Sequence, residues 1–237
     1  MLKWFISYLS NRKQYVAMKN YESEFETAHT LHINDKVIKN VASGKYLGIL
    51  IDNDLKWIKH IKYLYNKLIK FVSIFNKIRS ELPFEILRLS YFAFVHSHLS
   101  YGIAIYGNTT TNHLSKLLVL NNRLLRILQH KPFNAHTIDF YNTYFTLPPQ
   151  LLHTDQILIF MHRYVHNRSE LLVIFSTYFE EKQFTHHHNT RHKHDFHTHF
   201  VQTEFGKRIT KYKRCKLWNN LPDDVKGKDH VILLDLD

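Results

Sequence analysis

Hydrophobic side chains recur at three- and four-residue steps from Ile58 to Ile78, which is the spacing of the buried face of an amphipathic helix. Asn53 or Asp54 is suited to cap the start of such a helix, and Pro83 limits its end. The pattern therefore predicts one long helix from about residue 53 to shortly before residue 83.

A second helix is predicted directly behind the first. Pro83 suits its first turn, and its apolar positions run from Leu87 to Val95. An apolar stretch follows, and Gly102 or Gly107 is expected to end it.

Two more helices follow in the remaining periodic sequence. One begins at Thr111 or Asn112 and carries leucines along one flank as far as Leu128. Prolines then interrupt the pattern, and another helix is predicted from about Gln150 to His166. With short connections, the helices up to residue 130 should form a compact bundle.

The front of the chain has the shorter period of β-strands. Hydrophobic residues from Leu31 to Val41 surround the turn pair Asn34-Asp35, which predicts a hairpin leading to a strand from Tyr46 to Ile51. The predicted fold is mainly α with a short β-hairpin near the N-terminus.

Positive charge is concentrated on the predicted bundle. The 237 residues contain 32 Lys and Arg against 20 Asp and Glu, a net charge of +12, which favours polyanionic partners such as nucleic acid. Residues 53 to 130 hold 11 Lys and Arg against 3 acids, so this stretch carries +8 of that charge.

Five lysines share one side of the first long helix, opposite its apolar side: Lys56, Lys59, Lys67, Lys70 and Lys77. Such a stripe is either an ordinary solvated face or a surface that contacts phosphates. Because no carboxylate lies between Lys56 and Lys77 to neutralise the stripe, the pattern favours phosphates.

A second basic cluster and a histidine-rich segment lie near the C-terminal end. Six cations fall between Lys207 and Lys216, and seven histidines fall between residues 186 and 199. The histidines could bind zinc or nickel, but no regular ligand spacing is visible, so we predict no metal site and expect a polar surface that becomes more cationic as pH falls.

The single cysteine and the lack of a long apolar run bear on the compartment. As the single cysteine, Cys215 cannot form an internal disulfide, which favours a reducing environment. Its side chain is expected to be buried. No apolar run approaches the roughly 20 residues of a membrane-spanning helix. We therefore expect an intracellular protein, nuclear or cytoplasmic, without a membrane partner.

Five blocks, taken in their order and spacing, resemble the reverse transcriptases of non-LTR retrotransposons, including jockey-like elements. The second block matches the pattern Leu-x-Trp-x-x-His-Ile of that family. The blocks are Lys45 to Gly48, Leu55 to Ile61, Leu99 to Thr109, His188 to Arg191 and Lys216 to Pro222. A turn-rich segment, Leu31 to Ile38, precedes the first block as in that family, and Leu117 to Arg126 stands in the place of its leucine and arginine helix.

This resemblance implies a role for each part of the chain. Residues 1–52 would be the remnant of the polymerase palm with its primer-grip hairpin at Tyr46, Leu47 and Gly48. Residues 53–130 would be a thumb-like basic helical bundle, and residues 131–237 a helical and irregular C-terminal segment with the histidines at 186–199. The RNA or DNA template-primer would bind the five lysines together with Arg123 and Arg126.

The family reaction is RNA-directed DNA synthesis with magnesium, and the resemblance places the metal-binding aspartates before Met1. Asp223-Asp224 is better explained as the first turn of a helix, and Asp52 and Asp54 as capping or turn residues. We therefore predict no catalytic residue, no metal site and no cofactor in this chain, and no polymerase activity when it is alone.

Other parts of a parent protein would then be separate partners, namely the upstream palm and fingers and an endonuclease domain. Two alternatives remain open. The chain could be an unstable relic open reading frame with no binding role, or an enzyme completed by a separately encoded palm.

Overall fold

The structure is a computed structural model that describes residues 31–33, 36–38, 41–132, 134–175, 178–182, 195–198 and 200–227. The chain divides into two units, residues 1–40 and residues 41–237. In the first unit, β1 (Leu31–Ile33) pairs antiparallel with β2 (Lys36–Ile38). This confirms the predicted hairpin, while its expected turn at Asn34-Asp35 lies outside the described residues.

The second unit begins with another antiparallel hairpin, formed by β3 (Ser43–Tyr46) and β4 (Ile49–Asp52). Leu47 and Gly48 connect the strands with φ angles of 44° and 83°, the left-handed conformation at both central positions of a tight hairpin turn. The prediction of one continuous strand from Tyr46 to Ile51 was therefore wrong. Gly48 tolerates this conformation and allows the chain to reverse inside an apolar run.

Helices fill the rest of the unit. Those before residue 130 are α2 (Ile58–Leu68), α3 (Lys70–Ile78), α4 (Phe84–Tyr91), the π-helical turn η1 (Phe92–His96), α5 (Ser97–Ser100), α6 (Ile103–Tyr106) and α7 (Thr111–Leu128). Those after it are α8 (Ile138–Tyr144), α9 (Pro149–His166), the 3₁₀ turns η2 (Arg168–Glu170) and η3 (Val173–Phe175), α11 (Glu204–Arg208), α12 (Thr210–Asn219) and α13 (Asp223–Lys226). The mainly helical fold is confirmed.

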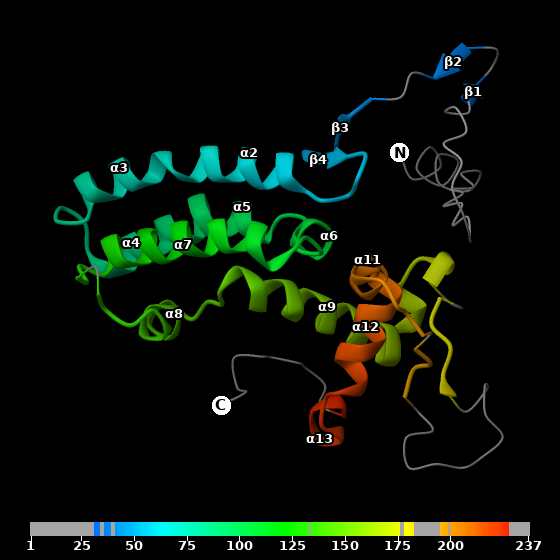
Figure 1. The fold of residues 1–237 in the computed structure, drawn as a ribbon. Coiled ribbons are helices and arrows are strands. Elements are labelled where there is room, and N and C mark those ends of the chain that lie inside the picture. Colours follow the sequence, from blue (N-terminus) through cyan, green and yellow to red (C-terminus); the bar gives the residue numbers. More distant parts are fainter. Residues whose placement is uncertain are drawn as a thin grey trace. The chain divides into compact units, whose positions relative to one another are not determined.

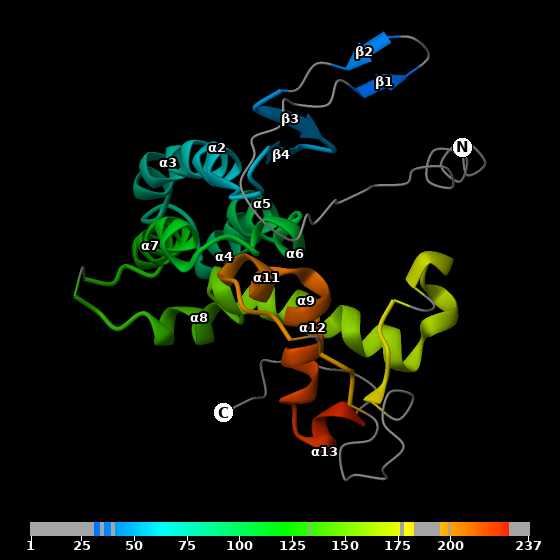
Figure 2. The same cartoon turned by 45° about the vertical axis from the view of Figure 1, so that its right-hand side comes forward.

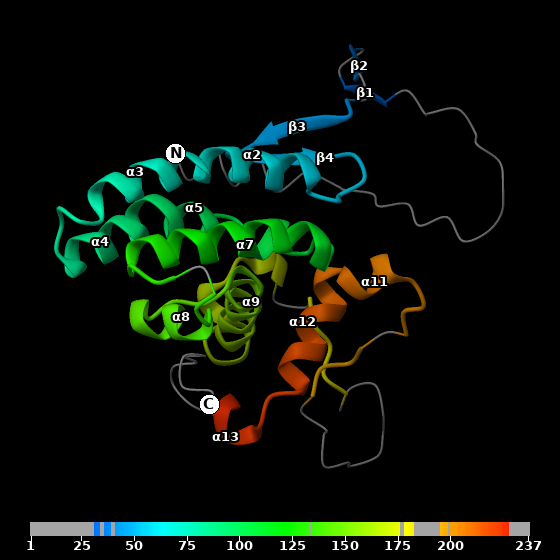
Figure 3. The same cartoon turned by 60° about the vertical axis from the view of Figure 1, so that its left-hand side comes forward.

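The first long helix differs from its prediction in two ways. It begins at Ile58, several residues later than expected, and it is interrupted at Ile69, which separates α2 from α3. Ile69 keeps helical dihedral angles (φ −58°, ψ −27°), so the two helices still run in nearly one direction (Figure 3).

The second unit has three helical layers (Figure 1). α2 and α3 pack on α7, and α9 packs on α7, α5 and α6 from the other side. Turning the molecule shows α12 beside α9, and α11 packs on α12 (Figure 2). The hairpin β3–β4 lies against the start of α2.

Two hydrophobic cores share helix α9. The larger extends from Ile49 through the leucines of α7 to Leu152, and the smaller joins the second half of α9 to Phe196, Cys215 and Trp218. Cys215 is buried as expected, and burial raises the pKa of its thiol to about 11. Of the histidine-rich segment 186–199, only residues 195–198 are described.

Candidate nucleic-acid interface

Asp52, at the end of β4, determines where helix α2 begins. Its buried carboxylate accepts hydrogen bonds from the backbone N–H groups of Lys56 (2.8 Å), Trp57 (3.2 Å) and Ile58 (3.2 Å). These are donors that a helix start leaves unsatisfied. The capping role inferred for Asp52 is confirmed, but the assignment of the helix start to Asn53 or Asp54 was wrong, because the capping carboxylate comes from the preceding strand.

The hairpin turn is held in place by the corner between α5 and α6. The hydroxyl of Tyr101 donates to the carbonyl oxygen of Leu47 at 2.5 Å, and the ring of Tyr101 lies 3.4 Å from where a Cβ on Gly48 would be. Gly102 has a φ angle of 70°, which side-chain-bearing residues rarely adopt, and a Cβ there would lie 2.5 Å from the end of the Ile49 side chain, so both features favour glycine.

Helix α2 holds the same hairpin from its other side. The Nδ1 atom of buried His60 accepts from the backbone N–H of Leu50 at 3.2 Å. Burial lowers the pKa of His60, which keeps its ring neutral and able to accept this bond. The ring of Tyr106 lies 4.9 Å from that of His60, and Thr109 Oγ1 donates to the carbonyl of Lys56 at 2.7 Å.

The residues predicted for the primer grip therefore lie at an exposed tip that is fixed to the helices. Tyr46 and Leu47 are 46% and 63% exposed, although the carbonyl oxygen of Leu47 is hydrogen-bonded to Tyr101. The three sequence blocks around residues 45–52, 55–61 and 99–109 meet at this place. Three blocks that are separate in the sequence therefore form one packed junction.

The five predicted lysines are all exposed, but they do not behave alike. Lys56 lies in the turn before α2 and pairs with Asp54 at 3.1 Å. Lys59 bends back to the hairpin, where its Nζ donates to Ser43 Oγ at 2.9 Å. These two lysines are partly engaged by the protein itself.

The remaining three lysines, Lys67, Lys70 and Lys77, line the outer side of α2 and α3, and we call them the lysine row. Within the described ranges none of them forms an ion pair with a carboxylate. Burial, and then the nearby charge of Lys67, lower the pKa of His98. The row is a cationic surface without local neutralisation.

The two predicted arginines are separated by the packing of α7. Arg123 is exposed. Arg126 is half-buried, with its guanidinium 5.7 Å from the centre of the Phe140 ring on α8. The structure therefore places the guanidinium of Arg126 against α8, whereas Arg123 remains exposed.

Two exposed lysines that the sequence reasoning omitted also lie near this surface. Lys62 on α2 and Lys116 on α7 line a groove between those helices. Lys62 lies outside the narrow arc that the five lysines span, and Lys116 lies on α7, whose sequence pattern is dominated by the leucines of its buried face. The absence of carboxylates near either would have been the available signal.

Within the part of the chain that the structure describes, no three His, Cys, Asp or Glu side chains gather in a way that could hold a metal ion. None of the described helices has the length and apolar character needed to cross a membrane.

Comparison with known proteins links part of this chain to one kind of polymerase. It is 28% identical over 110 residues to the RNA-directed DNA polymerase from mobile element jockey of Drosophila funebris, and 26% identical over 110 residues to that of Drosophila melanogaster. Each match covers 45% of this chain and 12% of the relative. This chain resembles a piece of a jockey reverse transcriptase. The resemblance inferred from the ordered motifs is thereby confirmed.

No family model matches the chain, and no solved structure matches it. The matched segment is a small fraction of the jockey polymerases, so their whole-protein activity does not transfer directly.

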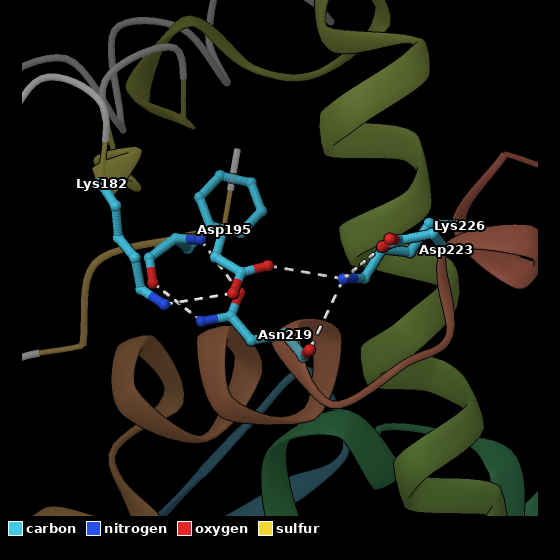
Figure 4. Close-up of polar contacts among 6 residues, drawn as sticks. Lys182, Asp195, Asn219, Asp223 and Lys226 are labelled. Carbon is cyan, nitrogen blue, oxygen red and sulfur yellow. Dashed lines mark hydrogen bonds and ion pairs between the residues drawn. The ribbon is translucent and has the colours of Figure 1, made fainter. Parts of the chain in front are cut away.

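The last block of this jockey-like sequence has a structural role at the C-terminal end (Figure 4). Asn219 bonds both backbone groups of Phe196: its Oδ1 accepts from the N–H at 3.0 Å, and its Nδ2 donates to the carbonyl at 2.8 Å. Trp218 is buried in the smaller core, and Pro222 immediately precedes α13. The block therefore fixes a distant loop segment against α12.

The only Asp-Asp pair of the sequence lies at the start of α13, as predicted. Asp223 pairs with Lys226 at 3.4 Å, and Lys226 also contacts buried Asp195 at 3.4 Å (Figure 4). Lys182 reaches the other oxygen of Asp195 at 3.1 Å. These carboxylates take part in a network of lysines that ties the C-terminal segments together.

Proposed function

We propose that this chain holds the template-primer nucleic acid of a jockey-like RNA-directed DNA polymerase, with the lysine row contacting phosphates and the hairpin tip at Tyr46, Leu47 and Gly48 directing the primer end. The observation that carries the proposal is the lysine row itself. Three exposed ammonium groups follow one side of α2 and α3 with no carboxylate partner among the described residues. Phosphate contacts of this kind supply affinity without reading sequence.

The rigid hairpin supports the same proposal. A grip on a strand end requires a tip that does not move relative to the helices that hold the duplex. Asp52 and His60 join the hairpin to α2, the helix on which the lysine row begins. Lys56, Lys59 and Arg123 would add longer-range attraction, because they are exposed and cationic.

We further propose that the chain does not polymerise DNA by itself. Phosphoryl transfer to a primer 3′ hydroxyl uses two divalent cations clamped by carboxylates. In a parent polymerase, magnesium and the palm that holds it would be supplied by other segments. A primer-extension assay with magnesium should show no synthesis by this chain, and metal-dependent extension would contradict this part of the proposal.

The binding experiment is a salt series of fluorescence anisotropy with a labelled primer-template duplex. We expect the triple variant Lys67→Glu, Lys70→Glu, Lys77→Glu to bind more weakly, and the slope of log affinity against log salt to fall by about 3, because about 0.9 counterions are released for each phosphate neutralised. The matched control is Lys131→Glu, Arg163→Glu, Lys216→Glu, which makes the same charge change at exposed cations outside the lysine row.

Equal losses of affinity and slope in the two triple variants would reduce the effect to net charge and remove the lysine row from the proposal. Circular dichroism of each variant should show an unchanged cooperative unfolding transition. The same measurement on the unmodified chain addresses the alternative of an unstable relic, which predicts no such transition.

A further inference from the structure

A groove with a volume of about 660 Å³ runs between α2 and α7, beside the lysine row and not part of it. Its lining combines the aliphatic side chains of Ile58, Ile61 and Val119 and the ring of Tyr65 with three polar side chains, which are those of Asn66, His113 and Ser115. Val119 has 66% of its surface exposed, and Ile58 is exposed as well. The groove therefore leaves apolar side chains of two helices in contact with solvent.

The charges around this groove are all of one sign. Lys62 stands on the α2 side and Lys116 on the α7 side, and both are exposed. Among the described residues that line the groove, none is Asp or Glu. A partner that fits must combine an apolar face with negative flanks.

The two helices also present their N-terminal ends at the same end of the groove. Thr109, just before α7, donates to the carbonyl of Lys56, just before α2, and α7 continues past α2 to contact α3. The helices thus run parallel, and the partial positive charges of both dipoles lie together. A helix lying between them is best placed antiparallel, with its negative C-terminal end at that position.

We propose that the α2–α7 groove binds an amphipathic helix of a protein partner whose flanks carry Asp and Glu. From Ile58 to Tyr65 the lining of α2 extends about 10 Å, roughly two helical turns, which suits anchors at i, i+3 or i+4, and i+7. A nucleic-acid strand fits less well. Successive bases bind by stacking on aromatic rings, and the groove offers only the rings of Tyr65 and His113, whereas Ile58, Ile61 and Val119 present aliphatic surface.

The test uses a fluorescein-labelled designed peptide of about 15 residues, long enough to populate a helix, with Leu at the anchor positions and Glu on both flanks. Saturable micromolar binding is expected, and Val119→Glu should weaken it at least about tenfold, because it removes a central apolar contact and repels the flanks. The matched control is Leu89→Glu on α4, where the replaced side chain is 64% exposed and does not line the groove. This control should bind the peptide unchanged.

Reversing the charges of Lys62 and Lys116 tests whether they attract the acidic flanks of the peptide. The variant Lys62→Glu, Lys116→Glu should bind the Glu-flanked peptide more weakly and a Lys-flanked version of the same peptide more tightly. A spin label at the C-terminal end of the peptide should broaden NMR signals near Ile58 more than those near Tyr65. The lysine-row variant Lys67→Glu, Lys70→Glu, Lys77→Glu should bind the peptide normally, which separates this proposal from nucleic-acid binding.

Three results would each overturn the proposal. One is the absence of saturable peptide binding, and another is an equal loss of binding in Val119→Glu and Leu89→Glu. The third is displacement of the peptide by a single-stranded oligonucleotide whose own affinity falls in Val119→Glu but not in Leu89→Glu, since the groove would then belong to nucleic acid.

Discussion

Helices α2 and α3, which carry the lysine row, and helix α12 are both rich in basic residues. The lysines of the row are exposed, whereas several basic side chains of α12 pack against neighbouring side chains. Lys67, Lys70 and Lys77 extend from helices whose apolar side is buried beneath them. On α12, Arg214 lies 4.0 Å from the centre of the Phe160 ring, and Lys213 Nζ lies 3.2 Å from Nδ1 of buried His153. Charge density alone does not distinguish a binding surface from cations that hold a core together.

The difference follows from what each helix must bury. α12 contributes Cys215 and Trp218 to the smaller core while carrying cations around its circumference, so the alkyl stems and the guanidinium plane of those cations cover apolar neighbours. Lys211 also interacts with the protein itself, since its Nζ lies 3.6 Å from Glu180 and 5.8 Å from the centre of the Tyr178 ring. We therefore expect variants of Lys213 and Arg214 on α12, whose side chains contact buried neighbours, to change stability and variants in the lysine row to change binding.

The variant Arg214→Glu is expected to have the largest effect and tests this contrast most directly. It would place a carboxylate against Phe160, where the present guanidinium is half-buried, and should lower the free energy of unfolding by about 3 kcal/mol or more. Urea unfolding followed by circular dichroism measures this loss. Lys77→Glu makes the same charge change in the lysine row and should stay within about 0.5 kcal/mol of the unmodified protein. Comparable losses would show that the two regions do not differ as described.

The next largest effect is expected from acidification, which should lower the free energy of unfolding through His153 beside α12. Burial first, and then the charges of Lys213 and Arg214, lower the pKa of His153 to about 3. In the unfolded chain this histidine titrates near 6.5, so the unfolded state binds the extra proton between those values. Stability is then fully present above pH 6.5 and falls as pH drops toward 3, by up to about 1.4 kcal/mol per pH unit.

The measurement is urea unfolding at pH 7, 6, 5 and 4. His153→Gln should unfold more easily at pH 7 yet lose less stability on acidification than the unmodified protein. An identical pH dependence in both proteins would assign the effect to other groups, of which buried His60 is one, because its pKa is also lowered by burial.

The hydrophobic periodicity predicted the helices that bury one face, because the spacing of Leu114, Leu117 and Leu124 on α7 places these side chains on the same, buried side. It could not predict the reversal at Leu47 and Gly48, since residues 46–51 read as one short β-type run that contains a single glycine. It also misplaced the start of α2, because the capping group Asp52 precedes the helix by six residues. These features depend on contacts between separate elements.

The candidate site was predictable only in part for the same reason. The exposure of the lysine row follows from helical geometry, whereas the engagement of Lys59 with Ser43 requires the position of the hairpin. Arg126 shares its helix with Arg123, but its orientation is decided by the contact of α7 with α8. The α2–α7 groove exists only once two helices distant in sequence are packed.

The comparison extends to acidic side chains at the hairpin. Asp52 is buried and accepts three backbone hydrogen bonds, whereas Asp54 is about half exposed and pairs only with Lys56 among the interactions described. Asp52→Ala should lower the free energy of unfolding by about 1 to 2 kcal/mol, the range for loss of a helix cap. Asp54→Ala should change it by less than about 0.5 kcal/mol. Thermal unfolding of the two variants side by side measures both, and equal effects would refute the assigned role of Asp52.

The smallest expected effect gives the finest resolution of the two basic regions. Lys77→Gln and Lys211→Gln remove the same charge, one from the lysine row and one from α12. If the row contacts phosphates, Lys77→Gln should reduce the slope of log affinity against log salt by about 0.9 for duplex DNA, while Lys211→Gln should leave the slope nearly unchanged because its ammonium already faces Glu180. Since both variants have the same net charge, a difference in slope can arise only from where the phosphates lie. A larger decrease in Lys211→Gln would place the polyanion on α12 and reverse the assignment of the two regions.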